Sequence, residues 1–192
     1  MSWSLGEIRS LAIKATRGAG MPWGLAEEAG YSVTWLEERS IRGVQALAVY
    51  LQELSEHKSD VCPIASGAAI SDFGDWRDQF PRQLQQPILV VPFLAGVLGS
   101  ESVVLEWSDH SVVLNAAGVT GHVGEEAIGG GIHRCQVREG VVSALTSHRE
   151  TRVRSDRKLF VSALEEFAHK TYAPSTEESR AKGAGAGLSD ND

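Results

Sequence analysis

The segment from Arg17 to Glu28 holds the residue types that a binding site for a small anion needs. Arg17 can hold a carboxylate or a phosphate through two parallel hydrogen bonds. Gly18 and Gly20 have no side chain, so the backbone there can come close to a ligand. Trp23 adds a flat apolar wall. The segment therefore predicts an anion-binding site.

Three further side chains are candidates for catalysis: Glu27, Glu28 and Cys62. The two glutamates can act as acid, base or hydrogen-bond acceptor beside the predicted anion site. Cys62 can act as a nucleophile where a histidine or a helix N-terminus favours its thiolate form. A less specific interpretation is a capped helical hairpin with acidic residues at its surface and a buried structural thiol. The residue types alone leave both interpretations open.

The segment from Gly183 to Asp192 alternates glycine and alanine and then carries an acidic run at residues 190–192. Gly183 and Gly185 give it a backbone that can thread into a groove, and Arg180 can bind an anion. The acidic oxygens suit Mg²⁺ or Ca²⁺, although their spacing differs from that of an EF-hand. We expect this tail to dock near the predicted anion site, on its own subunit or a partner subunit. A solvated tail is the alternative.

A metal site is the weakest of the candidate sites. His133 and Cys135 alternate along a predicted strand, so their side chains share a face. Together with His122 they offer ligands that suit zinc or copper. No second cluster of ligands completes the site, so we expect no metal and place Cys135 in the core. The sequence also lacks the GxGxxG pattern of dinucleotide-binding folds, and it identifies no cofactor.

The composition excludes several classes of partner. The chain has 192 residues, with 25 acidic and 18 basic side chains and a net charge of −7. Affinity for nucleic acids depends on basic residues that neutralise phosphates, so we expect no nucleic-acid partner. The longest apolar run, from Ile88 to Leu98, is interrupted by Pro92 and Gly96 and is too short to cross a bilayer. No signal peptide is recognisable, so we expect a cytoplasmic protein without membrane contact.

Three antiparallel helices are expected within residues 1–57. Ser4 and Glu7 have the spacing of a capping box, and apolar residues follow at helical intervals. Pro22 fits the first turn of the second helix, where a missing N–H has no cost. Gly43 introduces the third helix. Short connections between the three favour an antiparallel arrangement.

The middle of the chain predicts loops and then a sheet. Residues 58–86 are rich in small residues and only weakly periodic, so we expect mostly loop there. Within residues 87–154 we expect a mainly antiparallel sheet, beginning with a buried strand from Ile88 to Leu94. Two hairpins are expected in this sheet, at residues 102–115 and 132–147.

The last element is a helix over residues 155–172, followed by the Gly-Ala-rich tail at residues 173–192. Its predicted buried face consists of Leu159, Phe160, Ala163, Leu164 and Phe167. Helices followed by antiparallel strands and another helix define the α+β class. We therefore predict a single α+β domain over residues 1–172.

Three stretches of the chain together have a familiar sequence. Residues 14–30 read KATRGAGMPWGLAEEAG, residues 62–68 read CPIASGA, and residues 172–180 read YAPSTEESR. On these stretches the chain resembles the DUF3726 family of short bacterial proteins, over essentially its whole length. The resemblance implies a soluble bacterial protein and identifies no catalytic residue.

Two classes of function follow from these observations. The first is an enzyme, or an enzyme subunit, that binds a small carboxylate- or amide-bearing metabolite. The second is a non-catalytic protein that binds a partner through its helical face and its tail. A groove with convergent polar groups favours the first, and a flat apolar patch favours the second. Self-association into a homo-oligomer is compatible with either.

Overall fold

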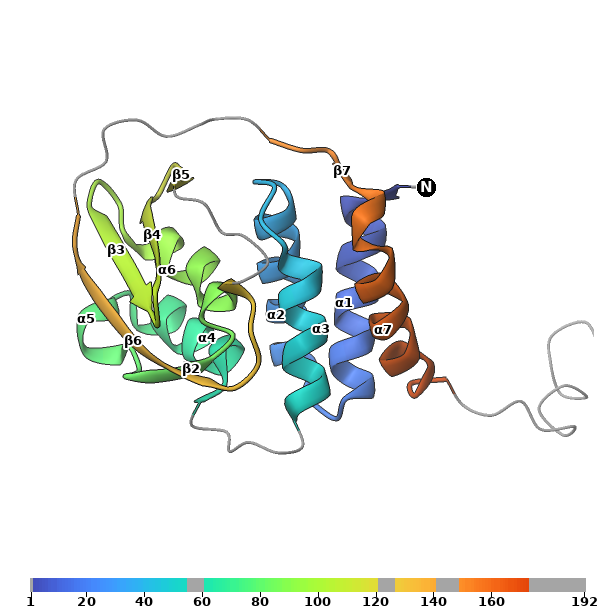
Figure 1. Ribbon diagram of the computed structural model, residues 1–192. Helices are drawn as coiled ribbons and strands as arrows, with labels where there is room; N and C mark the ends of the chain where they lie inside the picture. Colours follow the sequence, from blue (N-terminus) through green and yellow to red (C-terminus); the bar gives the residue numbers. More distant parts are fainter. Residues whose placement is uncertain (1, 55–60, 121–126, 141–148, 173–192) are drawn as a thin grey trace, which may run out of the picture.

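The computed structural model describes residues 2–54, 61–120, 127–140 and 149–172 of the chain. A group of long helices and a sheet backed by shorter helices lie side by side (Figure 1). Helices come first in the chain, antiparallel strands follow, and a helix comes last, which is the predicted α+β class. The long helices are α1 (Leu5–Gly18), α2 (Trp23–Glu37), α3 (Gly43–Glu53) and α7 (Lys158–His169).

The start of α1 confirms the predicted capping box. The Glu7 amide donates to Ser4 Oγ at 3.2 Å, and the Ser4 amide donates to the Glu7 carboxylate at 2.6 Å. Helix α2 follows Pro22, and α3 begins at Gly43, as the sequence predicts. Helix α1 packs against α2 and α7, and α3 packs against α2 and α7. Their contact faces are the predicted apolar stripes, with Ala12, Val33 and Leu47 fully buried.

The prediction of loops over residues 58–86 is wrong for most of that segment. It contains α4 (Pro63–Phe73), α5 (Trp76–Gln79) and the short strand β2 (Gln83–Gln85). Helix α4 is built from small residues because it packs closely against Phe93, and a Cβ at Gly67 would lie 2.2 Å from that ring. Small residues weaken a hydrophobic period, so the sequence pattern hides this helix.

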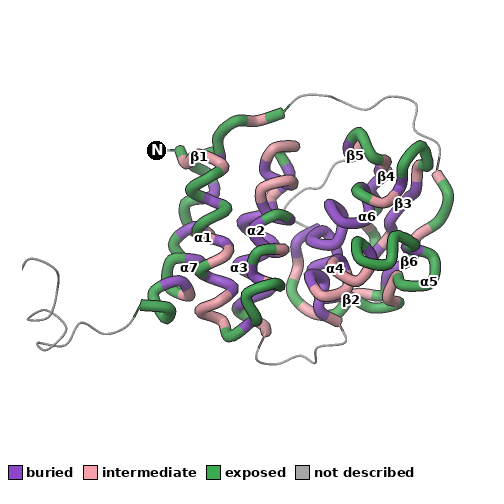
Figure 2. Tube along the Cα trace, turned by 180° about the vertical axis from the view of Figure 1, so that it is seen from behind, coloured by how far each residue is buried: buried purple, intermediate pink, exposed green. Residues whose placement is uncertain are grey.

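The prediction of a strand from Ile88 to Leu94 is also wrong. The segment forms a 3₁₀ turn, η3 (Pro87–Val90), and then helix α6 (Val91–Val97). Both elements begin with a proline in their first turn, where the ring is compatible with helical geometry. Residues 88–95 are all buried, which explains the nearly continuous apolar run (α6 in Figure 2), and periodicity cannot separate such a helix from a buried strand.

Besides β2, the main sheet contains β3 (Ser102–Trp107), β4 (His110–Asn115), β5 (Gly118–Thr120) and β6 (Ile132–Glu139). It is antiparallel, with strand order β2-β6-β3-β4-β5. The hairpin of β3 and β4 is confirmed, with Trp107 opposite His110 beside the turn. Residues 141–147, the second half of the other predicted hairpin, lie outside the described residues.

A short two-stranded sheet joins the start of the chain to the approach to α7. In it β1 (Trp3–Ser4) pairs with β7 (Arg152–Val153). A 3₁₀ turn, η5 (Ser155–Arg157), then leads into α7.

The predicted buried face of α7 is only partly correct. Leu164 is buried, but so are Val161 and Ala168, whereas Leu159 is 75% exposed. Val161, Leu164 and Ala168 recur at intervals of three and four residues, so the face that α7 buries is rotated from the predicted one.

Candidate functional site

At the predicted anion site of the α1–α2 corner, Arg17 makes contacts within the protein. The Arg17 guanidinium donates to the Met21 carbonyl and lies 5.0 Å from the centroid of the Trp23 ring. Trp23 itself is 62% exposed. Part of the hydrogen-bonding capacity of Arg17 is therefore used to hold the corner together.

The two glycines of this corner have structural roles. A Cβ at Gly18 would lie 1.8 Å from the Phe167 carbonyl oxygen, so α1 and α7 can approach only because this residue has no side chain. Gly20 has a φ of +96°, a conformation that side chains disfavour. Both glycines are explained without a ligand.

The three candidate catalytic residues do not share a site. Glu27 is exposed, and Glu28 is half-buried where desolvation and the charges of Asp72 and Glu27 raise its pKa. Asp72 lies near the end of α4, whereas Cys62 is the N-cap residue of the same helix. Eleven helical residues span about 16 Å, so Glu28 and Cys62 lie near opposite ends of α4.

Cys62 is buried and its sulfur accepts two hydrogen bonds. The Ala65 amide lies 3.3 Å from the sulfur, and the Tyr50 hydroxyl lies 3.0 Å from it. Burial raises the pKa of the Tyr50 hydroxyl, which therefore stays protonated and acts as the donor. The thiol caps α4 from within the core. Arg180, Gly183 and Gly185, the tail residues of the predicted site, lie outside the described residues.

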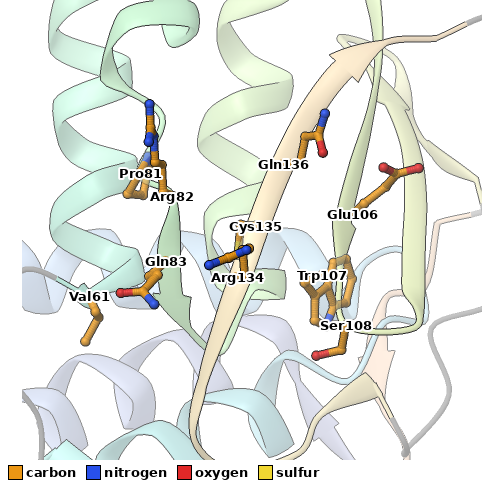
Figure 3. A pocket seen from close by; sticks show the side chains of 10 residues that line it. All are labelled: Val61, Pro81, Arg82, Gln83, Glu106, Trp107, Ser108, Arg134, Cys135 and Gln136. Carbon is orange, nitrogen blue, oxygen red and sulfur yellow. The ribbon is translucent and has the colours of Figure 1, made fainter.

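A broad groove of about 1050 Å³ lies over the outer face of the sheet, where β2, β6 and β3 meet (Figure 3). Along β6 the buried Cys135 alternates with the exposed Arg134 and Gln136. The side chains of Arg134 and Gln136 therefore form part of the groove floor. The groove is lined by Val61, Pro81, Arg82, Gln83, Glu106, Trp107, Ser108, Arg134, Cys135 and Gln136.

Polar side chains from neighbouring strands line this groove. Arg134 lies directly opposite Gln83 in the β2–β6 register, so the two side chains are neighbours on the outer face. Gln136, two residues further along β6, is opposite Glu106 of β3. Arg82 comes directly before β2, beside Pro81 (Figure 3). Within the described residues, neither Arg82 nor Arg134 has an ion-pair partner.

The acidic residue of the groove is neutralised. Arg138 donates to Glu106 Oε1 from Nη2 at 2.7 Å and from Nε at 2.9 Å. These hydrogen bonds hold the pKa of Glu106 below its usual value. The groove therefore offers two arginines to a ligand, while its carboxylate already has a cation.

The predicted pair of soft ligands lies at the edge of the groove. His133 Nδ1 is 3.0 Å from Ser108 Oγ, and the Cys135 thiol donates to the His133 carbonyl at 3.4 Å. Burial raises the pKa of the Cys135 thiol to about 11, so the group stays protonated in the core, as predicted. Among the residues that the structure describes, no three potential ligands come together to hold a metal ion. His122 lies outside them.

Comparison with known proteins places the first third of the chain in a family. Residues 3–72 match DUF3726, described as a protein of unknown function. The chain contains a DUF3726 domain over these residues. The match includes the first two stretches on which the resemblance rests, and residues 172–180 lie beyond it. No curated protein and no solved structure matches the chain.

The matched residues 3–72 contain α1, α2, α3 and all of α4 except Phe73, whereas α7 and nearly all of the groove lining lie outside them. Among the described residues, Val61 is the one residue of the match that lines the groove. In the described part of the chain, no helix combines the length and apolarity needed to cross a membrane.

Sequence reasoning missed the groove, although one signal was present. The expected strand at residues 132–138 carries Arg134, Gln136 and Arg138 at alternate positions. Alternation of this kind indicates a polar outer face. The partner residues Arg82 and Gln83 gave no such signal, because they stand in a segment without recognisable period.

Proposed function

We propose that the protein binds a small metabolite carrying a carboxylate and an amide or carbonyl group in the groove over β2, β6 and β3. The supporting observation is Arg134, which lies on the groove floor between two glutamine side chains and has no counter-ion among the described residues. Arginine binds carboxylates through paired hydrogen bonds, and glutamine amides both donate and accept. This donor and acceptor set suits a ligand with both groups.

The proposal concerns binding and assigns no bond-making step to the groove. Glu27, Glu28 and Cys62 are absent from its lining, so the enzyme hypothesis rests on residues that do not meet the proposed ligand. An anion bound at Arg134 would lie in a locally cationic region of an acidic protein, because Arg138 already neutralises Glu106. Binding would weaken as salt concentration rises, because the groove is open to solvent.

Partner binding through the helical face is the second candidate. Two large aromatic side chains support it, because Trp23 at the start of α2 is 62% exposed and Phe73 at the end of α4 is 70% exposed. Exposed aromatic residues are enriched where proteins contact one another. The tail, which would complete this surface, lies outside the described residues.

A thermal-shift series with matched acids tests the binding proposal. Succinate, succinamate and succinamide differ only in how many carboxylates are replaced by amides. We expect succinamate to raise the melting temperature most, because it supplies one group to Arg134 and one to the glutamines. Arg134→Ala should remove this shift. The double variant Glu106→Gln with Arg138→Ala removes the neighbouring ion pair without leaving an uncompensated carboxylate in the groove, and it should keep the shift.

Two results would contradict the proposal. One is a ligand-induced shift that survives Arg134→Ala unchanged. The other is a shift that is lost on Arg17→Ala, which would return the site to the α1–α2 corner.

A further inference from the structure

A buried carboxylate stands where α2, α3 and the approach to α7 meet. Glu37 is the last residue of α2 and is only 4% exposed. Its Oε1 accepts a hydrogen bond from the Val44 amide at 2.9 Å, in the first turn of α3. The carboxylate therefore caps α3 from the preceding helix and satisfies one of its free amides.

The cation that faces Glu37 is poorly aligned with it. Arg157, the last residue of η5, is also 4% exposed, and its Nε lies 3.7 Å from Glu37 Oε2. This Nε has no hydrogen-bond partner among the described residues. The same guanidinium donates from Nη1 to Asp156 Oδ2 at 2.7 Å. A buried ion pair with such geometry does not compensate for the loss of water around both charges.

The charges around Glu37 come from two neighbouring elements. Arg157 and Asp156 face it from η5, and Arg42 faces it from the N-cap of α3. Burial raises the pKa of Glu37 to about 7, against the opposing effects of the Val44 hydrogen bond and the two arginines. Asp156 adds to the increase.

The segment of residues 149–157, here called the strap, connects the region after the sheet to α7 and lies against this same corner (Figure 1). The Glu150 amide donates to the Glu38 carbonyl at 2.7 Å, and Ser40 Oγ donates to the Glu150 carboxylate at 3.1 Å. Val153 of the strap pairs with Trp3 through β7 and β1. Arg152 also holds the strap by donating to Ser2 Oγ and to the Ser2 carbonyl, each at 2.9 Å, and Arg157 holds it at the α2–α3 corner.

We propose that Glu37 is a proton-operated latch for the strap. With a proton on the Glu37 carboxyl group, the corner holds one buried charge fewer and the strap stays closed. When the proton leaves to solvent, the ionised carboxylate gains more from water than from Arg157, so separation of the strap from the α2–α3 corner is favoured. Opening releases this proton, and rising pH therefore promotes opening by linkage.

Amide hydrogen exchange of the full chain tests the latch. The probes are the amides of Val44 and Glu150, whose acceptors are Glu37 and Glu38. After correction for intrinsic exchange rates, we expect their protection to fall on the order of tenfold between about pH 5.5 and about pH 8. Glu37→Gln should keep the protection high and independent of pH. Glu38→Gln, the same change one residue along, should behave like the unmodified chain.

Protection that does not vary with pH in the unmodified chain would overturn the proposal, as would a pH dependence that persists in Glu37→Gln. If Glu37→Gln fails to fold, the pKa of Glu37 is measured in the unmodified chain by following its carboxyl ¹³C chemical shift as a function of pH. A midpoint near 7 supports the latch, and a midpoint near 4.5 overturns it.

Discussion

The α2–α3 corner and the sheet groove both contain arginines, but their arginines have opposite surroundings. Arg157 in the corner is buried and faces the carboxylates of Glu37 and Asp156. Arg134 in the groove is exposed and has no counter-ion among the described residues. An arginine whose charge is already compensated within the fold serves the structure, whereas an exposed one without a described partner is available to a ligand. The contrast favours the groove as the binding site and the α2–α3 corner as structural.

The largest effect on stability is expected at Gly18, where α1 packs closely against α7. Gly18→Ala should destabilise the protein by about 3 kcal/mol, because its new Cβ would collide with the backbone of α7 at Phe167. For a chain of this length the melting temperature should fall by roughly 6–12 °C. Gly6→Ala is the matched control in the same helix, since its Cβ meets no atom within 4 Å, and it should be neutral or slightly stabilising. Equal melting temperatures for the two variants would show that the corner is open enough for a ligand.

The next effect is a pH dependence of stability that originates in the α2–α3 corner. The folded state raises the pKa of Glu37 from 4.5 to about 7, so it binds a proton more tightly than the unfolded chain. This contribution is favourable below about pH 4.5, decreases as the pH rises, and is lost above about pH 7. We expect a loss on the order of 3 kcal/mol across this window. Urea unfolding at several pH values measures it, and Glu37→Gln should flatten the curve.

A smaller effect is expected on ligand affinity in the groove. Arg134→Ala should weaken succinamate binding by about tenfold, the effect of one lost charge-assisted contact, and leave the melting temperature of the free protein nearly unchanged. Calorimetric titration measures the affinity. An Arg134→Ala variant that binds as tightly as the original chain but melts lower would make this arginine structural, and the contrast between the two regions would disappear.

The smallest effect is expected at the ion pair beside the groove. Arg138 and Glu106 are both substantially exposed, and exposed pairs contribute little to stability. Removing both charges together, by Glu106→Gln with Arg138→Ala, should therefore cause no measurable change in melting temperature or in succinamate affinity. A clear loss of affinity would mean that the ligand extends over β3 and that Arg138 leaves Glu106 to bind it.

The helical part could be predicted from the sequence because its signals are local. The spacing of Ser4 and Glu7 defines a capping box, and the apolar stripes of α1 to α3 recur at helical intervals. Helices α4 and α6 could not be predicted in this way. Helix α4 has a glycine, Gly67, where it contacts Phe93, and α6 lies in a segment in which residues 88–95 are all buried. In both helices, tertiary packing determines the sequence pattern.

The candidate site depended on information that the sequence does not contain. Arg134 and Gln83 are far apart in the chain and become neighbours only through the β2–β6 register. Gly18 and Gly20 suggested a ligand site, but Gly18 is needed for helix packing and Gly20 for its backbone conformation. The sequence alone does not distinguish such glycines from those that make room for a ligand. The predicted docking of the tail at this corner stays a prediction, because residues 173–192 lie outside the described part.

The central claim is that the groove, and not the α1–α2 corner, receives the ligand. The most direct measurement is a ¹H–¹⁵N titration of the full chain with succinamate, following backbone amides and arginine Nε groups together. The account predicts saturable shifts at Arg82, Gln83, Arg134 and Gln136, with the signals of Arg17 and Trp23 unchanged. Shifts centred on Arg17 and Trp23, with the β2 and β6 signals unmoved, would contradict it.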